Sequence, residues 1–263
     1  MTAAEDPILL HYRDQARTLG HDELSTMADE TTRRLELDAI LACMRDALSG
    51  QPTGRVLEIG CGNGLLLARL RAEFPEIDLS GCDYTPEMVE LAAARGVERC
   101  TVQREDIRGL TYADGAFDVI VAERVLINVL DRAGQEQSLR ELHRVLAPGG
   151  VFVMIEAFSD GLTNLNRARE ELGLEPNVVP HHNLWFDTDW FAGAIAGLFE
   201  PVVGDDLPPA NFLSSHYFVS RVVYPAVTRR EVIHNTEFVK FFSFLPPRGE
   251  FAAIQLRYLR RVG

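Results

Sequence analysis

Residues 56–64 read Val-Leu-Glu-Ile-Gly-Cys-Gly-Asn-Gly, a short apolar run that ends in three glycines at alternate positions. Glycine adopts positive φ without strain and lets the backbone approach a ligand closely. A helix that follows such a turn presents free amide groups at its N-terminus. The stretch therefore predicts a buried strand, a ligand-binding turn and a helix. Glu58 precedes the first glycine by two residues, and its charge would repel a pyrophosphate but suits a cationic or hydroxyl-rich ligand.

The glycine spacing does not match the dinucleotide-binding fingerprint. That fingerprint needs a third glycine three residues after the second, and this chain has Leu65 there, which disfavours a nicotinamide-dependent reductase. The pattern instead resembles the first motif of class I S-adenosylmethionine-dependent methyltransferases, with Glu58, Gly60, Gly62 and Gly64 in the motif positions. The resemblance covers residues 56–156. It implies S-adenosylmethionine as the methyl donor and S-adenosylhomocysteine as the product.

Length and charge restrict the class of protein. A chain of 263 residues holds one α/β core with an appendage. The net charge of −13 argues against nucleic acid as a partner, because phosphate binding needs clustered Lys and Arg. The sequence shows neither a basic leader nor an apolar run of membrane-spanning length, so we expect a cytoplasmic protein that acts on a small molecule without a membrane partner. The four cysteines lack C-x-x-C spacing and are expected to be reduced.

Hydrophobic periodicity predicts alternating strands and helices. A helix is expected over residues 29–49, capped by Asp29, and others over 65–74, from Pro86, and over 135–146. Further strands are expected over 77–83, 100–106, 117–122 and 151–156. This alternation indicates a doubly wound, mostly parallel α/β sheet. The family resemblance implies a Rossmann-like sheet of seven strands with an antiparallel last strand.

The C-terminal third departs from the plainest form of this fold. We expect a helix over 191–199 and strands over 201–205 and 253–259. The interpretation divides the chain into an N-terminal helical cap (1–50), the donor-binding core (51–206), an insertion (207–251) and a last core strand (252–263). The insertion is rich in aromatic residues and carries His216 and His234. It is expected to cover the acceptor or to form a homodimer surface.

Several residues at the ends of predicted strands are candidates for donor binding. Asp83 ends the second strand about twenty residues after the glycine turn, the position of a ribose-binding carboxylate, and Tyr84 is expected beside it. The resemblance implies that Asp106 and Ile107 receive the adenine. It also implies that Glu123 lies at the methionine end of the donor. Arg33 or Arg34 is a candidate to contact the donor carboxylate, with a solvated helix face as the equal alternative.

The chemistry requires alignment of donor and acceptor and, for a hydroxyl acceptor, a base. His182 is the first candidate for that base and His181 the second, because both follow Pro180 in a loop expected near the carboxyl rim. Glu123 is a third catalytic candidate. The candidate substrate contacts are Arg124, Asn183 and Tyr217. No metal site is predicted, although a loosely held magnesium ion beside a hydroxyl acceptor stays open.

The sequence therefore predicts an S-adenosylmethionine-dependent methyltransferase that acts on a small-molecule oxygen. A sugar or other polyhydroxylated acceptor is favoured by analogy, because the segments at 184–186 and 243–247 resemble methyltransferases of polysaccharide and secondary metabolism. Nitrogen and carbon acceptors stay open. A catalytically inactive protein that binds the donor and serves as a partner is the alternative from another class.

Overall fold

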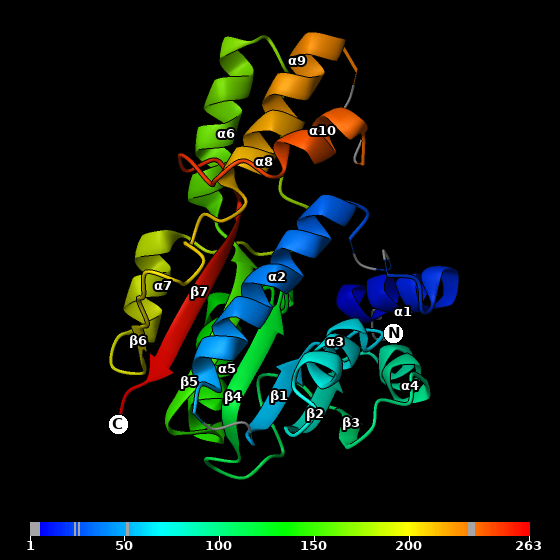
Figure 1. The fold of residues 1–263 in the computed structure, drawn as a ribbon, viewed down its shortest axis with the longest axis vertical. Helices are drawn as coiled ribbons and strands as arrows, with labels where there is room; N and C mark the ends of the chain where they lie inside the picture. Colours follow the sequence, from blue (N-terminus) through cyan, green and yellow to red (C-terminus); the bar gives the residue numbers. More distant parts are fainter. Residues whose placement is uncertain (1–5, 24, 26, 51–52, 231–234) are drawn as a thin grey trace, which may run out of the picture.

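The computed structural model describes residues 6–23, 25, 27–50, 53–230 and 235–263, and His234 lies outside them. Its centre is a seven-stranded sheet with the order β3-β2-β1-β4-β5-β7-β6 (Figure 1). β7 pairs antiparallel with both of its neighbours, whereas the other pairs are parallel. The expected α/β fold with an antiparallel last strand is confirmed. The strands are β1 (Arg55–Ile59), β2 (Asp78–Asp83), β3 (Cys100–Arg104), β4 (Phe117–Glu123), β5 (Leu146–Ala157), β6 (Phe199–Pro201) and β7 (Ile254–Arg261).

The central position of β1 fixes the location of the glycine turn. β1 lies between β2 and β4, with Glu58 opposite Gly81 on one side and Val121 on the other. The glycine turn that follows β1 therefore lies beside the carboxyl ends of β2 and β4. Gly60, Gly62 and Gly64 have φ values of 69°, 51° and 78°, as the sequence predicted. At Gly60 a Cβ atom would come within 2.4 Å of Val125 Cγ2, so the turn also needs a residue without a side chain.

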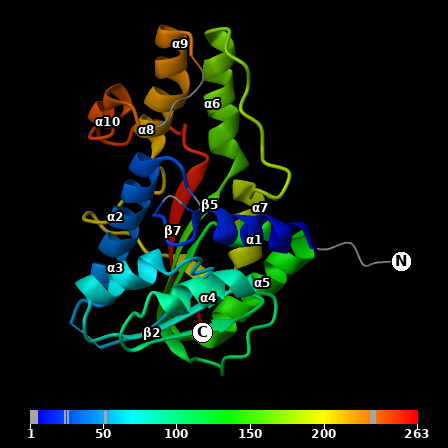
Figure 2. The same ribbon diagram turned by 90° about the vertical axis from the view of Figure 1, so that its right-hand side faces the viewer.

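Helices cover both faces of the sheet (Figures 1 and 2). The predicted helix after Asp29 is confirmed, because the Asp29 carboxylate accepts a hydrogen bond of 3.0 Å from the Thr32 amide and caps the N-terminus of α2. α4 begins at Pro86, as predicted. α1 lies beside α4, where Arg13 and Glu87 form an ion pair of 2.8 Å. These helices are α1 (Pro7–Leu19), α2 (Glu30–Ala47), α3 (Leu65–Glu73), α4 (Pro86–Ala94), α5 (Arg132–Val145) and α7 (Thr188–Ile195).

A second group of helices extends beyond the carboxyl ends of the parallel strands, at the top of Figure 1. It combines α6 (Ser159–Glu171) with α8 (Ser214–Phe218), a π-helix (Val219–Val223), α9 (Tyr224–Thr228) and α10 (Glu237–Phe242). The sequence did not predict α6. A Cβ atom on Gly161 of α6 would lie 1.9 Å from the Ala252 carbonyl oxygen, so this helix crosses the chain just before β7 at very close range.

Two boundaries near residue 200 differ from the prediction. The expected helix over 191–199 ends at Ile195, and the expected strand over 201–205 is β6 at Phe199–Pro201. The strand lies earlier because Phe199, Glu200 and Pro201 pair with the final residues of β7. Periodicity alone does not reveal this pairing, since the two strands are far apart in sequence.

Candidate functional site

A cavity of about 390 Å³ lies at the carboxyl ends of β1, β2 and β4. It is lined by the glycine turn and by most of the residues predicted to bind the donor. These are Glu58, Gly60, Gly62, Asp83, Tyr84, Asp106, Ile107 and Glu123. Gly64 is absent from the lining, and a Cβ atom there would come within 3.1 Å of the Ala92 backbone, so Gly64 lets α3 pack closely on α4. We call this space the donor cavity.

Asp83 fixes the shape of the donor cavity by joining two of its edges. Its Oδ2 accepts a hydrogen bond of 3.0 Å from the Gly62 amide, and its Oδ1 accepts one of 2.8 Å from the Thr85 amide. Burial raises the pKa of Asp83 above its ordinary value, although the backbone donors oppose that shift. Each carboxylate oxygen keeps a lone pair that these amides do not use. Asp83 can therefore accept two hydroxyl hydrogens from a ligand.

Glu58 provides a buried carboxyl group on the same wall. It is 5% exposed, and its Oε2 has no hydrogen-bond partner among the described residues. Burial, followed by the charges of Glu123 and Asp83, raises the pKa of Glu58 well above its ordinary value. A buried carboxyl oxygen without a partner is costly. A cationic or hydrogen-donating ligand would relieve that cost, and the donor amino acid end is of this kind.

Four charged side chains form a partly buried network between the donor cavity and α2. Arg33 Nη1 lies 3.0 Å from Glu123 Oε1, and Arg124 Nη2 lies 2.7 Å from the same oxygen. Arg124 also forms an ion pair with Glu36. Burial raises the pKa of Glu36 to about 7. Arg124 has a φ of 56°, an uncommon conformation for a residue other than glycine, and its charge is shared between two carboxylates.

The structure distinguishes between the two arginines of the predicted pair. Arg33 lines the donor cavity. Arg34 turns away, donates a hydrogen bond of 3.2 Å to the Ser243 hydroxyl, and places its guanidinium over the Phe244 ring. Arg33 is thus the arginine of this pair that can contact a donor carboxylate.

Asp106 also lies at the donor cavity, but its carboxylate is paired within the protein. Arg108 Nη2 donates to Asp106 Oδ2 at 2.6 Å, and the Arg108 amide donates to Oδ1 at 2.9 Å. The side-chain hydrogen bond from Arg108 lowers the pKa of Asp106. The carboxylate therefore stays ionised and can accept a further hydrogen bond, in keeping with its predicted contact with an adenine amino group.

A second cavity of about 490 Å³ adjoins the donor cavity, and we call it the acceptor cavity. Tyr12, Ser25 and Arg124 line both spaces. Of the predicted catalytic and substrate residues, His182, Asn183 and Arg124 line the acceptor cavity. His181 and Tyr217 line neither cavity. The remaining walls of the acceptor cavity are His11, Gln15, Leu19, Met27, Ala28, Ile127, Ala157, Pro180, Trp185 and Ile254.

His182 is held in the acceptor cavity by another imidazole. The rings of His182 and His11 stack with centroids 4.2 Å apart. Burial, followed by the charges of His11 and His181, lowers the pKa of His182 below 6.5. His182 is therefore neutral near pH 7 and can accept a proton. His181 is exposed and meets His182 edge-on.

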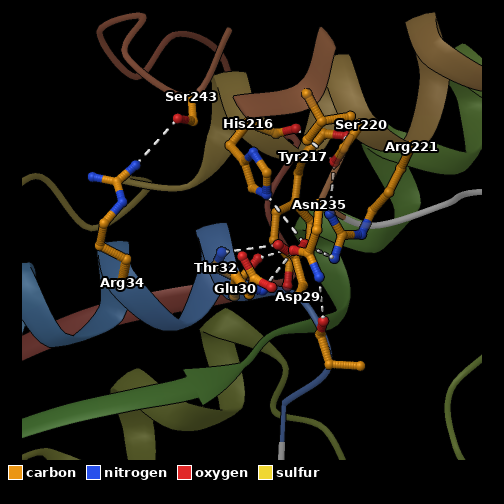
Figure 3. Close-up of polar contacts among 12 residues, drawn as sticks. Asp29, Glu30, Thr32, Arg34, His216, Tyr217, Ser220, Arg221, Asn235 and Ser243 are labelled. Carbon is orange, nitrogen blue, oxygen red and sulfur yellow. Dashed lines mark hydrogen bonds and ion pairs between the residues drawn. The ribbon is translucent and has the colours of Figure 1, made fainter. Parts of the chain in front are cut away.

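Tyr217 belongs instead to the contact between the insertion and α2. Figure 3 shows Asp29 at the centre of this contact. Asp29 Oδ2 lies 3.2 Å from His216 Nε2 and 3.3 Å from Arg221 Nη2, and the Arg221 guanidinium lies 3.7 Å from the Tyr217 ring centroid (Figure 3). The insertion therefore docks on the start of α2, the helix that carries Arg33 and Glu36.

Asn235 adds a second attachment of the insertion beside Asp29. Its Oδ1 accepts a hydrogen bond of 2.8 Å from the Glu30 amide, and its Nδ2 donates one of 3.0 Å to the Ala28 carbonyl (Figure 3). Ala28 lines the acceptor cavity. The insertion thus fixes a segment that lines this cavity, and none of the insertion's described residues belongs to the lining.

Three site residues were not singled out from the sequence. Glu156, at the end of β5, accepts hydrogen bonds of 2.7 Å from the amides of Val125 and Leu126 and holds the turn after β4. Asn128 and Tyr12 form a hydrogen bond between the two cavities. A carboxylate at the end of a buried strand was the available signal for Glu156. Tyr12 and Asn128 carry no comparable signal, because only the fold brings them together.

Neither a metal site nor a disulfide is found in the part of the chain that the structure describes. No group of three or more His, Cys, Asp or Glu side chains there has the geometry to hold an ion. The four cysteines are free thiols. None of the described helices is long and apolar enough to cross a membrane.

Comparison with known proteins agrees with the geometry of the donor cavity. Residues 56–150 match the family model described as "Methyltransferase domain". The chain is similar to this family over that segment. The matched segment runs from β1 into β5 and includes the predicted donor-binding residues from Glu58 to Glu123, whereas Arg33 and Arg34 lie before it.

Two curated relatives of this chain differ in the atom that they methylate. The chain is 35% identical over 111 residues to a ubiquinone/menaquinone biosynthesis C-methyltransferase of Geotalea daltonii, and this match covers 40% of this chain and 46% of the relative. It is 26% identical over 174 residues to a malonyl-[acyl-carrier protein] O-methyltransferase of Bacillus cytotoxicus, and this match covers 66% of this chain and 58% of the relative. The chain thus spans about half the length of these relatives.

Solved structures support the same fold over a longer stretch. The N-methyltransferase NodS from Bradyrhizobium japonicum, crystallised with S-adenosylhomocysteine, superimposes with a TM-score of 0.56. The match covers 95% of this chain and 97% of NodS at 16% identity. At that identity the likeness concerns the fold alone.

Proposed function

We propose that this protein transfers a methyl group from S-adenosylmethionine to a small molecule held in the acceptor cavity. The observation that carries the proposal is the pairing of the two cavities. One is rimmed by the residues predicted to bind the donor, and the other adjoins it at Tyr12, Ser25 and Arg124. Two reactants held in contiguous spaces meet the main requirement of a displacement reaction, which is alignment.

The residues of the donor cavity fit the donor chemically. Asp83 offers two free lone pairs to the ribose hydroxyls, and Asp106 is ionised and available to the adenine amino group. Glu58 offers a carboxyl oxygen to the amino group of the methionine end, and Arg33 offers a positive charge to its carboxylate. When bound there, S-adenosylmethionine supplies an electrophilic methyl group on a sulfonium sulfur.

His182 is the base that we assign to an oxygen acceptor. A hydroxyl nucleophile must lose its proton when its oxygen bonds to the methyl carbon, and the carbon–sulfur bond breaks with both electrons going to sulfur. The neutral imidazole of His182 lines the acceptor cavity and can take that proton. The relatives named above include both C- and O-methyltransferases, and the oxygen assignment rests on His182 rather than on them.

The acceptor cavity gives less support to a sugar than the sequence suggested. Most of its wall is apolar, including Leu19, Met27 and Ile127. A sugar would leave several hydroxyls facing these side chains without partners, which is costly. None of the relatives named above is described as a sugar methyltransferase. We therefore retain the small-molecule acceptor and drop the preference for a sugar.

Titration calorimetry with S-adenosylmethionine and S-adenosylhomocysteine tests the donor site. Micromolar binding of both is expected. A labelled-methyl screen with phenols, enols, amines and sugars then tests the transfer. Absence of binding to either compound would refute the proposal. Binding without transfer to any acceptor would favour the alternative, an inactive protein that keeps the donor pocket.

A further inference from the structure

Tyr12 occupies the border between the two cavities, because it is a residue of α1 that lines both of them. Its hydroxyl oxygen accepts a hydrogen bond of 2.9 Å from Asn128 Nδ2. Its ring meets the His11 imidazole edge-on, with centroids 5.0 Å apart. Since His11 stacks on His182, Tyr12 belongs to the same aromatic wall as the assigned base.

Backbone carbonyls fix the direction of this hydrogen bond. Asn128 Nδ2 also donates to the Arg124 carbonyl at 2.9 Å, and a carbonyl can only accept. The nitrogen of the Asn128 amide must therefore be the end that faces Tyr12. Asn183 orders the other end in the same way, since its Nδ2 donates to the His182 carbonyl at 3.0 Å and to Asn128 Oδ1 at 2.8 Å.

The fixed direction has a consequence for the Tyr12 hydrogen. Both hydrogens of the Asn128 amide nitrogen are used, one on the Arg124 carbonyl and one on Tyr12. The Tyr12 oxygen must accept, so its own hydrogen points elsewhere. No described residue accepts a hydrogen bond from it. Burial raises the pKa of Tyr12 above 10, so the hydroxyl stays protonated at neutral pH. Tyr12 is thus an unused neutral donor between the cavities.

Among the described residues, the rest of the acceptor cavity carries no unbalanced charge. Arg124, the one permanently charged residue in this described lining, forms ion pairs with Glu36 and Glu123. His11 and His182 both have lowered pKa values, mainly because of burial, and are neutral. The remaining wall is mostly apolar, and the stacked imidazoles give it a flat side. A charged occupant would lose its hydration without gaining a partner.

We propose that Tyr12 donates a hydrogen bond to the methyl acceptor, which is therefore an uncharged, flat molecule with a lone-pair oxygen or nitrogen beside the reacting atom. This inference rests on the proposed function for the meaning of "acceptor". The hydrogen bonds among Tyr12, Asn128 and Asn183 are observed independently of the proposed function. Asn128 and Asn183 are positioning residues, because they set the direction of the Tyr12 hydrogen bond without being required to touch the acceptor.

Two probes of the same shape separate hydrogen bonding from packing. Acetophenone carries a carbonyl oxygen, and α-methylstyrene carries a CH₂ group in its place. Their affinities for the protein are measured by NMR titration with and without saturating S-adenosylhomocysteine. Acetophenone is expected to bind about two- to twelvefold more tightly, since one net hydrogen bond contributes about 0.5–1.5 kcal/mol. Its carbonyl stretching frequency should fall on binding, because the Tyr12 hydrogen polarises the bond.

Two variants and a control test the role of Tyr12. Tyr12→Phe should abolish the preference for acetophenone and the frequency shift, both with and without S-adenosylhomocysteine. Asn128→Asp should have the same effect, because a carboxylate would accept the Tyr12 hydrogen and withdraw it from the cavity. Tyr258→Phe is the control, since the Tyr258 hydroxyl donates to Asp46 at 2.8 Å and lines neither cavity. Thermal melts verify that each variant folds. If Asn128→Asp does not fold, Tyr12→Phe alone is sufficient to test the role of Tyr12.

The outcomes distinguish the inference from the proposed function. Equal affinity for the two probes, no binding of either, or a preference that survives in Tyr12→Phe would overturn the inference. A preference that depends on Tyr12 in a protein that does not bind S-adenosylhomocysteine would support the inference and refute the proposed function.

Discussion

Replacement of Asp83 by alanine tests the donor site most directly. The Asp83 carboxylate uses one lone pair of Oδ2 on the Gly62 amide and one of Oδ1 on the Thr85 amide. Two lone pairs remain for the two ribose hydroxyls. Hydrogen bonds to charged groups contribute about 1.5–3 kcal/mol each. Loss of both should therefore weaken donor binding at least tenfold, which corresponds to about 1.4 kcal/mol.

The assay is titration calorimetry with S-adenosylhomocysteine, combined with a thermal melt to show that the variant is folded. Asp78→Ala is the matched control, because Asp78 begins the same strand at the opposite rim and pairs there with Arg99 at 2.8 Å. The control should bind normally. A folded Asp83→Ala protein with unchanged affinity would refute the ribose-binding role.

Three further predictions concern catalysis, packing and pH. His182→Ala should lower turnover about a hundredfold at unchanged S-adenosylhomocysteine affinity, and near-normal turnover of the variant removes His182 from the mechanism. In the unsubstituted protein, the pH at which turnover falls by half should lie below 6.5, because burial lowers the pKa of His182. Gly161→Ala should lower the melting temperature sharply, since its Cβ would lie 1.9 Å from the Ala252 oxygen. The control Gly193→Ala, in α7 with open space around it, should stabilise the protein by about 0.5–1 kcal/mol. Equal melting temperatures of the two variants would contradict the close approach of α6 to Ala252. Burial raises the pKa of Glu156 from 4.5 to about 8, so the folded state binds the extra proton and this residue's contribution to stability falls as pH rises from about 4.5 to 8. The free energy of unfolding, measured by chemical denaturation, should therefore depend less on pH in Glu156→Gln over that range. An unchanged pH dependence in the variant would contradict this assignment.

The sequence was sufficient for the core because the core is locally encoded. The glycine turn, the Asp29 cap and Pro86 each determine their own neighbourhood through backbone geometry, and the structure has them as predicted. Strand ends in a parallel sheet meet at one rim, so the position of Asp83 and Glu123 in sequence also gave their position in space.

The acceptor side was less predictable because it is assembled from distant segments. Tyr12 comes from α1, Asn128 follows β4 and Asn183 lies beyond α6, and no periodic pattern connects them. Tyr217 illustrates the opposite error. An aromatic residue in a predicted lid suggested a substrate contact, whereas the ring packs under Arg221 away from both cavities. Its role in binding is not supported by its position.

The placement of β7 has a consequence for how the chain folds. β7 lies between β5 and β6, yet its partners in β5 are about a hundred residues earlier in the chain, and pairing over such a separation has a large loop-closure cost and is slow. β6 pairs only with β7 in the described sheet. On a ribosome, one edge of the sheet therefore stays open until residues 254–261 have emerged, and nascent chains halted earlier should remain sensitive to protease near β5.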